Sequence, residues 1–189
     1  MNEKPIAAGK SSFDLVDFKQ LLDGLNIEPG KRFLDLACGG GNYTLALVEH
    51  VGPDGFIHAV DLWKEGIDAL NSVLRDRDIH TVRGQVADVG RHIPIDSASV
   101  DYCLMATVLH DLIQDQTDDG ALKEVVRVLK PGGKLAVVEF KKIDGPPGPP
   151  KEIRLSPRET EMHLRPRGFR LLETRDIGHC IYLSMLRLG

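Results

Sequence analysis

The sequence predicts an α/β fold, a doubly wound sandwich in which helices cover both faces of a mostly parallel seven-stranded sheet. Three observations support this prediction. Apolar runs alternate with amphipathic stretches over residues 31–140, as βαβ units require. Two strand-like runs then close the chain without a helix between them, which favours a C-terminal antiparallel hairpin. The length of 189 residues suits one domain, 1–189.

Each element has its own pattern. The N-terminal segment 1–30 carries a short helix, roughly Asp17 to Gly24. Strands are expected at 31–37, 55–61, 79–84, 100–106, 134–140, 169–175 and 180–188, and helices at 43–51, 63–76 and 120–130. A last helix begins after Ser156, with Glu159 completing a capping box. The segment 141–155, "KKIDGPPGPPKEIRL", is a loop because of its Pro/Gly density. Since it leaves the carboxyl end of a strand, it is expected to be either a lid over a ligand or a passive connector.

Composition excludes several classes of protein. The hydrophobic content is 42%, and neither a membrane-spanning stretch nor a signal peptide is expected. The three cysteines, Cys38, Cys103 and Cys180, lack C-x-x-C spacing, so neither a disulfide framework nor a metal site is indicated. A reducing cytoplasm is the expected location.

The net charge of −4 is unevenly distributed. Residues 141–189 contain 10 Lys/Arg against 6 Asp/Glu, a balance of +4, so the first 140 residues carry −8. The basic segment favours either an anionic substrate or a solvated face. The acidic main body, which has no basic and aromatic stripe, disfavours nucleic acid.

The stretch "FLDLACGGGNYTLAL", residues 33–47, runs from a strand through three glycines into a helix. Such a turn presents backbone N–H groups to a ligand. The dinucleotide fingerprint needs Gly or Ala at position 44, where Thr44 stands, and the phosphate-loop lysine is missing. Asp35, just before the turn, repels a polyanion and suits a cationic ligand. Asp61 ends the second strand, where doubly wound folds place an acid against ribose hydroxyls. S-adenosylmethionine, which has a ribose, a cation and no phosphate, meets these conditions.

Five segments, in order, resemble a known family. They are "LDLACGGGNYTLAL", "AVD" at 59–61, "GQVADV" at 84–89, "VDYCLMATVLHDL" and "LKEVVRVLKPGGKLAVVEF". Together they are similar to class I S-adenosylmethionine-dependent methyltransferases, in particular the small type 11 branch of the ubiquinone/menaquinone-biosynthesis type. The resemblance implies a Rossmann-like fold, S-adenosyl-L-methionine as methyl donor, S-adenosyl-L-homocysteine as product and a small-molecule acceptor. Ala37 departs from the family pattern, which usually has glycine there.

The resemblance also implies site residues. The cofactor site would consist of Asp35, Ala37, Cys38, Gly39, Gly40, Gly41, Asp61, Leu62, Ala87, Asp88, Val89 and Ala106. In this site Asp35 would hold the ammonium group, Asp61 the ribose, and Asp88 with Val89 the adenine edge. Leu62 and Ala87 would sandwich the adenine ring. For each of these residues a purely structural role is the alternative.

Catalytic and substrate residues are less clearly marked. His110 and Asp111 follow the fourth strand, where a base or substrate contact would lie beside the methyl donor; a helix-capping role is the alternative. Arg154, His179 and Tyr182 are candidate substrate contacts, with solvated or edge-strand roles as alternatives.

Three rival functions stay open. A non-catalytic S-adenosylmethionine-binding or regulatory module would keep the pocket without the chemistry. An arsenite methyltransferase would use the three thiols as soft ligands. An NAD-dependent oxidoreductase is disfavoured by Asp35 and Thr44. The sequence names neither the acceptor nor the oligomeric state.

Overall fold

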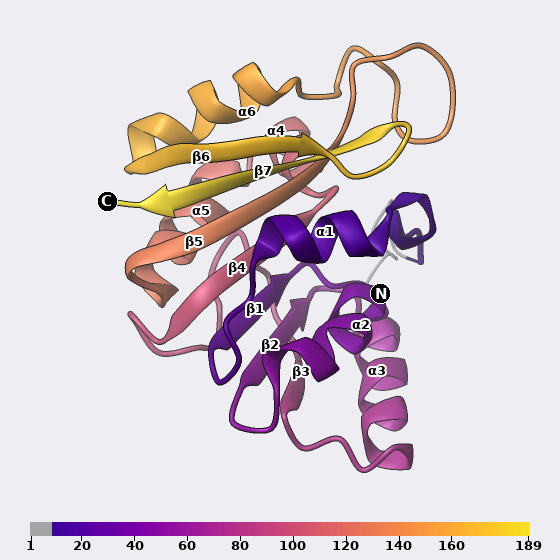
Figure 1. Ribbon diagram of the computed structural model, residues 1–189, viewed down its shortest axis with the longest axis vertical. Coiled ribbons are helices and arrows are strands. Elements are labelled where there is room, and N and C mark those ends of the chain that lie inside the picture. Colours follow the sequence, from indigo (N-terminus) through magenta and orange to yellow (C-terminus); the bar gives the residue numbers. More distant parts are fainter. Residues whose placement is uncertain (1–8) are drawn as a thin grey trace.

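A computed structural model describes residues 9–189, and the first eight residues of the predicted N-terminal segment lie outside this range. A seven-stranded sheet with the order β3-β2-β1-β4-β5-β7-β6 forms its centre (Figure 1). Strands β1 to β5 pair in parallel, whereas β7 is antiparallel to both β5 and β6. The predicted parallel sheet and C-terminal hairpin are therefore confirmed, and β6 is an edge strand.

The elements follow the predicted order. The strands are β1 (Arg32–Leu36), β2 (Phe56–Asp61), β3 (Val82–Val86), β4 (Val100–Ala106), β5 (Leu129–Phe140), β6 (Phe169–Asp176) and β7 (Ile181–Leu188). The α-helices are α1 (Phe18–Leu25), α2 (Asn42–Val51), α3 (Lys64–Asp76), α4 (Leu109–Gln114), α5 (Asp118–Val128) and α6 (Pro157–Leu164); the 3-10 turns are η1 (Phe13–Leu15) and η2 (Arg165–Arg167). The capping box of Ser156 and Glu159 at α6 is present as predicted.

Helices cover both faces of the sheet, and each face has its own apolar core. On one face, leucines of α1, α2 and α3 pack with Phe33 and Tyr102 of the sheet. On the other, residues of α4, α5 and α6 pack with Leu36, Met105 and Val137. Because the central strands are buried on both sides, they read as continuous apolar runs. Within the described part of the chain, no helix is long and apolar enough to cross a membrane.

Several bounds differ from the prediction, and the fifth strand, expected at 134–140, runs over 129–140. The third strand was expected at 79–84 but runs over 82–86, because Ile79 closes the end of α3 through a backbone hydrogen bond to Leu74, 2.9 Å long. The left-handed backbone of Asp78, with φ of 55°, ends that helix. The short helix α4 was also not predicted, since its six residues are too few for a clear periodic pattern.

The loop 141–155 is braced by one arginine. Arg154 is 2% exposed, and its guanidinium donates hydrogen bonds of 2.7–3.2 Å to five backbone carbonyls. These acceptors are the carbonyls of Lys141, Ile143, Gly145, Pro147 and Pro149. The guanidinium also lies 5.6 Å from the centre of the Phe140 ring. The hydrogen bonds from Arg154 to the carbonyls of the loop therefore order it. The function of the loop as a lid stays a prediction.

Candidate active site

The glycine turn after β1 is tied to the end of β2 by Asp61. The backbone N–H of Gly39 donates to Oδ2 of Asp61 at 2.7 Å, and that of Trp63 donates to Oδ1 at 2.6 Å. The backbone of Cys38 also donates to the carbonyl of Val60 at 3.1 Å. A carboxylate oxygen has two lone pairs, so each oxygen of Asp61 keeps acceptor capacity for a ribose hydroxyl. The role of Asp61 as ribose acceptor remains a prediction.

The three glycines of the turn have different functions. A Cβ at Gly39 or Gly40 would meet no atom within 4 Å, so the backbone there is open to an approaching ligand. A Cβ at Gly41 would come within 2.6 Å of Leu70, and Gly41 has a φ of 81°. Its N–H is already bonded to the carbonyl of Cys38. Gly41 therefore allows α2 and α3 to pack closely, and its contact with the cofactor stays a prediction.

Asp35 lies beneath the turn and is 1% exposed. The hydroxyl of Thr44, which is also buried, donates to its Oδ2 at 2.5 Å. The pKa of Asp35 is raised to about 6, mainly by burial and also by the nearby charge of Asp61, while hydrogen bonds from Thr44 oppose both. A cation placed here would stabilise the ionised form. Thr44, which the sequence analysis used only to exclude a dinucleotide, is thus the partner of Asp35.

The ends of β2 and β3 expose apolar side chains beside polar ones. Leu62 is 52% exposed and Val86 is 47% exposed, although both adjoin buried strands. The backbone N–H of Ala87 donates to the carbonyl of Asp61, and Oδ1 of Asp88 accepts from the N–H of Gly90. An exposed leucine beside a ribose-facing acid is suited to cover a flat heteroaromatic ring. Val89 is 8% exposed, so its side chain belongs to the core and only its backbone is a candidate contact.

These features fit S-adenosylmethionine. The open backbone of Gly39 and Gly40 leaves room for the amino-acid and ribose parts, and two carboxyl groups, Asp35 and Asp61, match an ammonium and a pair of hydroxyls. Leu62 supplies apolar surface for adenine. A polyphosphate would instead meet the two carboxyl groups, which repel it.

A buried His–Glu pair lies at the carboxyl ends of β4 and β5. Nδ1 of His110 is 2.9 Å from Oε1 and 2.8 Å from Oε2 of Glu139, and the backbone N–H of His110 donates to Oε1 at 3.2 Å. His110 is 4% exposed and Glu139 is fully buried. On the other side of the ring, Nε2 lies 3.4 Å from Oδ1 of Asp111. Burial alone would lower the pKa of His110, but the hydrogen bond and charge of Glu139, together with Asp111, raise it overall.

The sequence analysis missed Glu139. Its only sequence signal is a single charge within the apolar run "KLAVVEF", at the end where the strand meets the ligand edge. A carboxylate oriented toward Nδ1 fixes the ring orientation and leaves Nε2 as the atom available for proton transfer.

A second polar contact links the N-terminal segment to this edge. Oγ of Ser12 lies 2.9 Å from the hydroxyl of Tyr43 and 3.0 Å from Oγ1 of Thr107. Phe13 packs edge-on against the Tyr43 ring at 5.1 Å. Thr107 has a φ of 52°, a rare backbone conformation for a β-branched residue. Such strain clusters at functional sites, and here it lies in the turn between Ala106 and the His110 helix.

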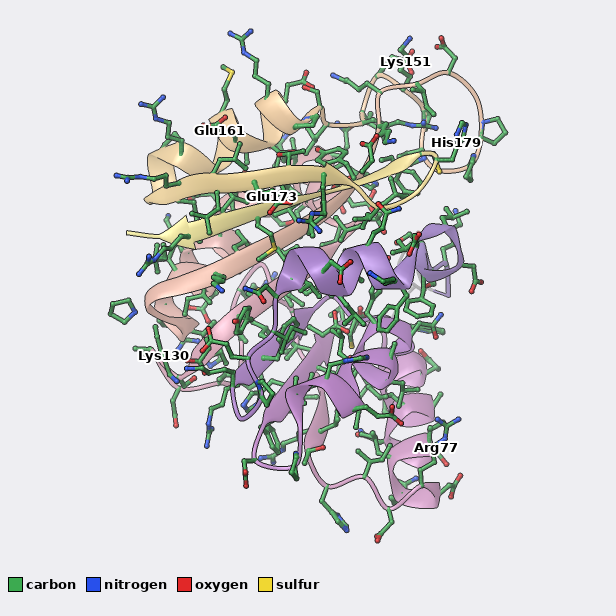
Figure 2. All side chains as sticks on the ribbon, in the orientation of Figure 1. Arg77, Lys130, Lys151, Glu161, Glu173 and His179 are labelled. Atoms are coloured by element: carbon green, nitrogen blue, oxygen red, sulfur yellow. The ribbon has the colours of Figure 1, made fainter. Side chains whose placement is uncertain are left out.

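Two of the three candidate substrate contacts, Arg154 and Tyr182, are bound to groups of the protein itself. Arg154 is neither solvated nor available to an anion, because all of its donors are bound to loop carbonyls. Tyr182 is 1% exposed; its hydroxyl donates to the carbonyl of Leu155 at 2.9 Å and contacts Thr160 at 2.8 Å, so it anchors the end of the loop. His179 is exposed on the connection between β6 and β7 (Figure 2), where its role is untested.

The arsenite alternative receives no support from the thiols. Cys103 belongs to one apolar core and Cys180 to the core on the opposite face of the sheet, so three thiols cannot meet at one ion. Burial raises the pKa of the Cys38 and Cys103 thiols, which disfavours the thiolate form that binds metals. Residues 9–189 contain no group of three or more His, Cys, Asp or Glu that would hold a metal ion.

The comparisons with known proteins agree with the site. A family profile described as "Methyltransferase domain", Methyltransf_11, matches residues 34–137. A demethylmenaquinone methyltransferase of Geobacillus sp. (strain WCH70) is 31% identical over 115 residues, which are 61% of this chain and 47% of that protein. The matched segment thus spans about half the length of this curated relative.

Solved structures give the same result for the fold. The crystal structure of a SAM-dependent methyltransferase from Aquifex aeolicus has a TM-score of 0.85 and 26% identity, covering 95% of this chain and 94% of that one. The [4+2]-cyclase SpnF has a TM-score of 0.76 at 18% identity, covering 100% of this chain and 85% of that one, and therefore shares the fold alone.

The fold and the family match place this chain among the S-adenosylmethionine-dependent methyltransferases. The family match covers more than half of the chain, so the chain belongs to the methyltransferase domain family, type 11.

Proposed function

We propose that this chain transfers a methyl group from S-adenosylmethionine to a small-molecule acceptor, and that His110 takes a proton from that acceptor. The observation that carries this proposal is the His110–Glu139 pair at the same sheet edge as the open glycine turn. A proton acceptor is useful only to an enzyme whose nucleophile must lose a proton. A passive binding module has no need for it.

We assign cofactor binding and proton transfer to different residues of the chain. Asp35, Asp61 and the open backbone at Gly39 would hold the cofactor. When bound, S-adenosylmethionine supplies an electrophilic methyl group on a sulfonium. Holding an acceptor in line with that group accounts for a large part of the catalysis. Glu139 keeps Nδ1 of His110 protonated, so Nε2 accepts the acceptor's proton, and Glu139 with Asp111 then stabilises the imidazolium.

The acceptor class follows from the base and from the relatives. An imidazole deprotonates a hydroxyl efficiently only when that hydroxyl is fairly acidic, as in phenols and hydroquinones. The relatives named as demethylmenaquinone methyltransferases act, by name, on a quinone precursor. We therefore propose a hydroxylated aromatic acceptor related to reduced demethylmenaquinone. We also propose a reducing compartment such as the cytoplasm, supported by three free cysteines.

A methyl-transfer assay tests this function. The protein is incubated with S-adenosylmethionine and a short-chain reduced demethylmenaquinone, and both products are followed by mass spectrometry. We expect S-adenosylhomocysteine and a hydroquinone that has gained one methyl group, in equal amounts. Binding of the cofactor without product from any hydroxylated aromatic acceptor would support the non-catalytic alternative. The fold does not decide this question, because the cyclase SpnF shares it.

A further inference from the structure

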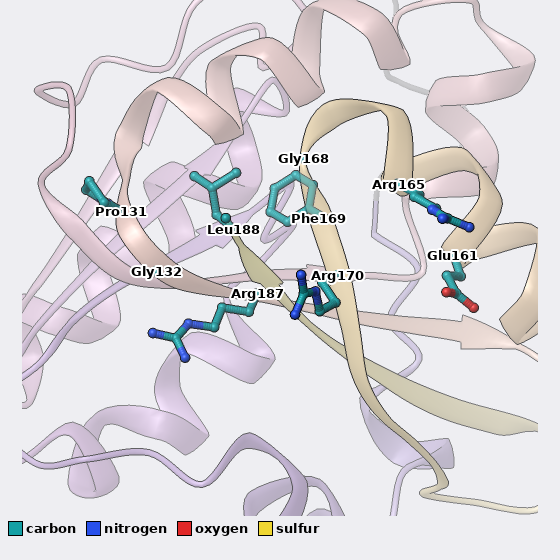
Figure 3. Close-up of a pocket in the computed structure, with 10 residues that line it drawn as sticks. Pro131, Gly132, Glu161, Arg165, Gly168, Phe169, Arg170, Arg187 and Leu188 are labelled. Atoms are coloured by element: carbon teal, nitrogen blue, oxygen red, sulfur yellow. The ribbon is translucent and has the colours of Figure 1, made fainter.

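A hollow among the described residues lies at the opposite end of the sheet from the cofactor edge. It has a volume of about 890 Å³ and is lined by residues at the start of β5, the end of β7 and the α6–β6 region. Because β5 begins where β7 ends, this hollow is at the amino ends of the parallel strands. Its three arginines, Arg165, Arg170 and Arg187, come from different elements, while Glu161 is the one acidic side chain among the lining residues (Figure 3).

Three cations stand in one row across the neighbouring strands. Lys134 of β5 is the register partner of Arg187 of β7, and Arg187 is the register partner of Arg170 of β6. Register partners point to the same face, and strands are about 4.8 Å apart. Like charges placed directly opposite each other destabilise a sheet. This row therefore costs stability unless an anion compensates it.

The protein itself does not supply that anion. Over residues 9–189, no carboxylate lies within 4.0 Å of the guanidinium nitrogens of Arg165, Arg170 or Arg187, whereas 18 ion pairs form elsewhere. Nearby cations are paired: Lys130 binds Asp101 at 2.8 Å and Arg167 lies 3.5 Å from Asp118. Three cations that lack such a partner therefore line one hollow.

Arg187 is also held in place. A Cβ on Gly132 would lie 3.1 Å from its Nη2 and 3.4 Å from its Nε, so its guanidinium packs on the bare backbone of Gly132 near the start of β5. A charged side chain on the edge strand β6 can serve to prevent pairing with a strand of another molecule. This explanation does not apply to Arg187, because β7 is an interior strand. A guanidinium is a planar fork of N–H donors, which suits phosphate oxygens.

We propose that this hollow is a second ligand site, which binds a small molecule carrying adjacent negative charges of the diphosphate type. Arg170 and Arg187 grip the two phosphoryl groups, and Arg165 closes the site from the α6 side. The basic balance of residues 141–189 is concentrated in part here. This site is separate from the methyl-transfer edge and does not depend on the proposed acceptor.

Titration calorimetry with inorganic pyrophosphate at low ionic strength tests the proposal. We expect one saturable site, weakened at least about tenfold by Arg187→Gln and by Arg170→Gln. Arg83→Gln, which removes an exposed arginine from β3 at the other edge of the sheet, is the matched control and should change affinity less than about twofold. Affinity for S-adenosylmethionine should stay unchanged in all three variants.

Thermal unfolding separates a ligand site from a structural role. Removing one arginine of a like-charge pair should leave Tm unchanged or raise it in the absence of pyrophosphate, and the pyrophosphate-induced rise in Tm should disappear. The proposal is overturned if no saturable binding occurs, if Arg83→Gln weakens binding as much as Arg187→Gln, or if only an oligonucleotide binds. A Tm that falls in both hollow variants would assign the arginines to folding instead.

Discussion

Nδ1 of His110 lies 2.8 Å from Oε2 of Glu139, and neither side chain is more than 4% exposed. Burying two ionisable side chains this deeply costs desolvation free energy, and the hydrogen bonds between them offset that cost. The pair lies at the ends of β4 and β5, with Nε2 on the far side from Glu139. This is the position that the proposed proton transfer to Nε2 requires.

The first prediction concerns Glu139→Gln. The His110 pKa is raised because Glu139 and Asp111 outweigh burial and the opposing charge of Arg154. The neutral base is present above that raised value, so methyl transfer should increase with pH through it. Glu139→Gln should lower kcat roughly tenfold to a hundredfold and shift the rising limb of the pH–rate profile to lower pH. Rates measured from pH 5 to 9 check this; a limb that does not move would remove His110 from the chemistry.

The same pair affects stability with a definite sign. A histidine whose folded pKa is raised stabilises the fold fully below its unfolded pKa, and this contribution is lost as pH rises through the folded value. Glu139→Gln should therefore flatten the fall in Tm above pH 6.5, the ordinary value for histidine. Thermal melts across that range check it, with Asp68→Asn as a control at an exposed carboxylate bound to Lys64.

Asp35→Asn should stabilise the protein and weaken its cofactor binding. With a folded pKa of about 6 against an ordinary 3.8, the fold holds a costly buried carboxylate above pH 6, and that cost is absent below about pH 4. Asparagine should therefore add roughly 1 to 3 kcal/mol to the free energy of unfolding at pH 8 and almost nothing at pH 4. Urea titrations at both pH values, with calorimetry for S-adenosylmethionine, check the two effects. Equal stabilisation at both pH values would contradict the assigned cause.

Asp61→Asn and Asp61→Ala should separate two roles of one side chain. Both variants lose the charged acceptor for ribose, so affinity for S-adenosylmethionine should fall at least about tenfold, or 1.4 kcal/mol. Asparagine keeps one oxygen for the N–H of Gly39 or Trp63, whereas alanine keeps none. Alanine should therefore also lower Tm. Unchanged affinity in both variants would show that the ribose assignment is wrong.

Arg154→Lys should loosen the loop 141–155. Lysine keeps the charge but cannot form five hydrogen bonds from a fork, so the free energy of unfolding should fall by about 1 to 3 kcal/mol. Limited proteolysis should cut within the loop sooner than in the parent protein or in Arg158→Lys, an exposed control on α6. If methyl transfer also changes while cofactor affinity does not, the loop serves as a lid for the acceptor.

The fold was predictable because its signals are local or periodic. Alternating apolar runs, the glycine turn and the capping box of Ser156 each determine an element without distant contacts. The third strand was placed too early because Ile79, although β-branched, is needed to close α3. That choice depends on packing, which a single sequence does not display.

The site was predictable only where backbone geometry determines it. Asp35, Asp61 and the glycines occupy fixed places after β1 and β2, and the structure brings them together. Glu139 was missed because its partner, His110, is 29 residues away in the sequence. Arg154 was misassigned because its partners are backbone carbonyls. Neither kind of partner leaves a pattern in the sequence. The buried charge in the strand ending at Phe140 is the one signal that pointed to Glu139.

Calorimetric titration with S-adenosylmethionine, S-adenosylhomocysteine and NAD tests the central claim most directly. The structure predicts saturable binding of both adenosyl compounds at one site, weakened at least about tenfold by Asp61→Asn, and no comparable binding of NAD. Tight binding of NAD, with S-adenosylmethionine failing to bind, would contradict the account.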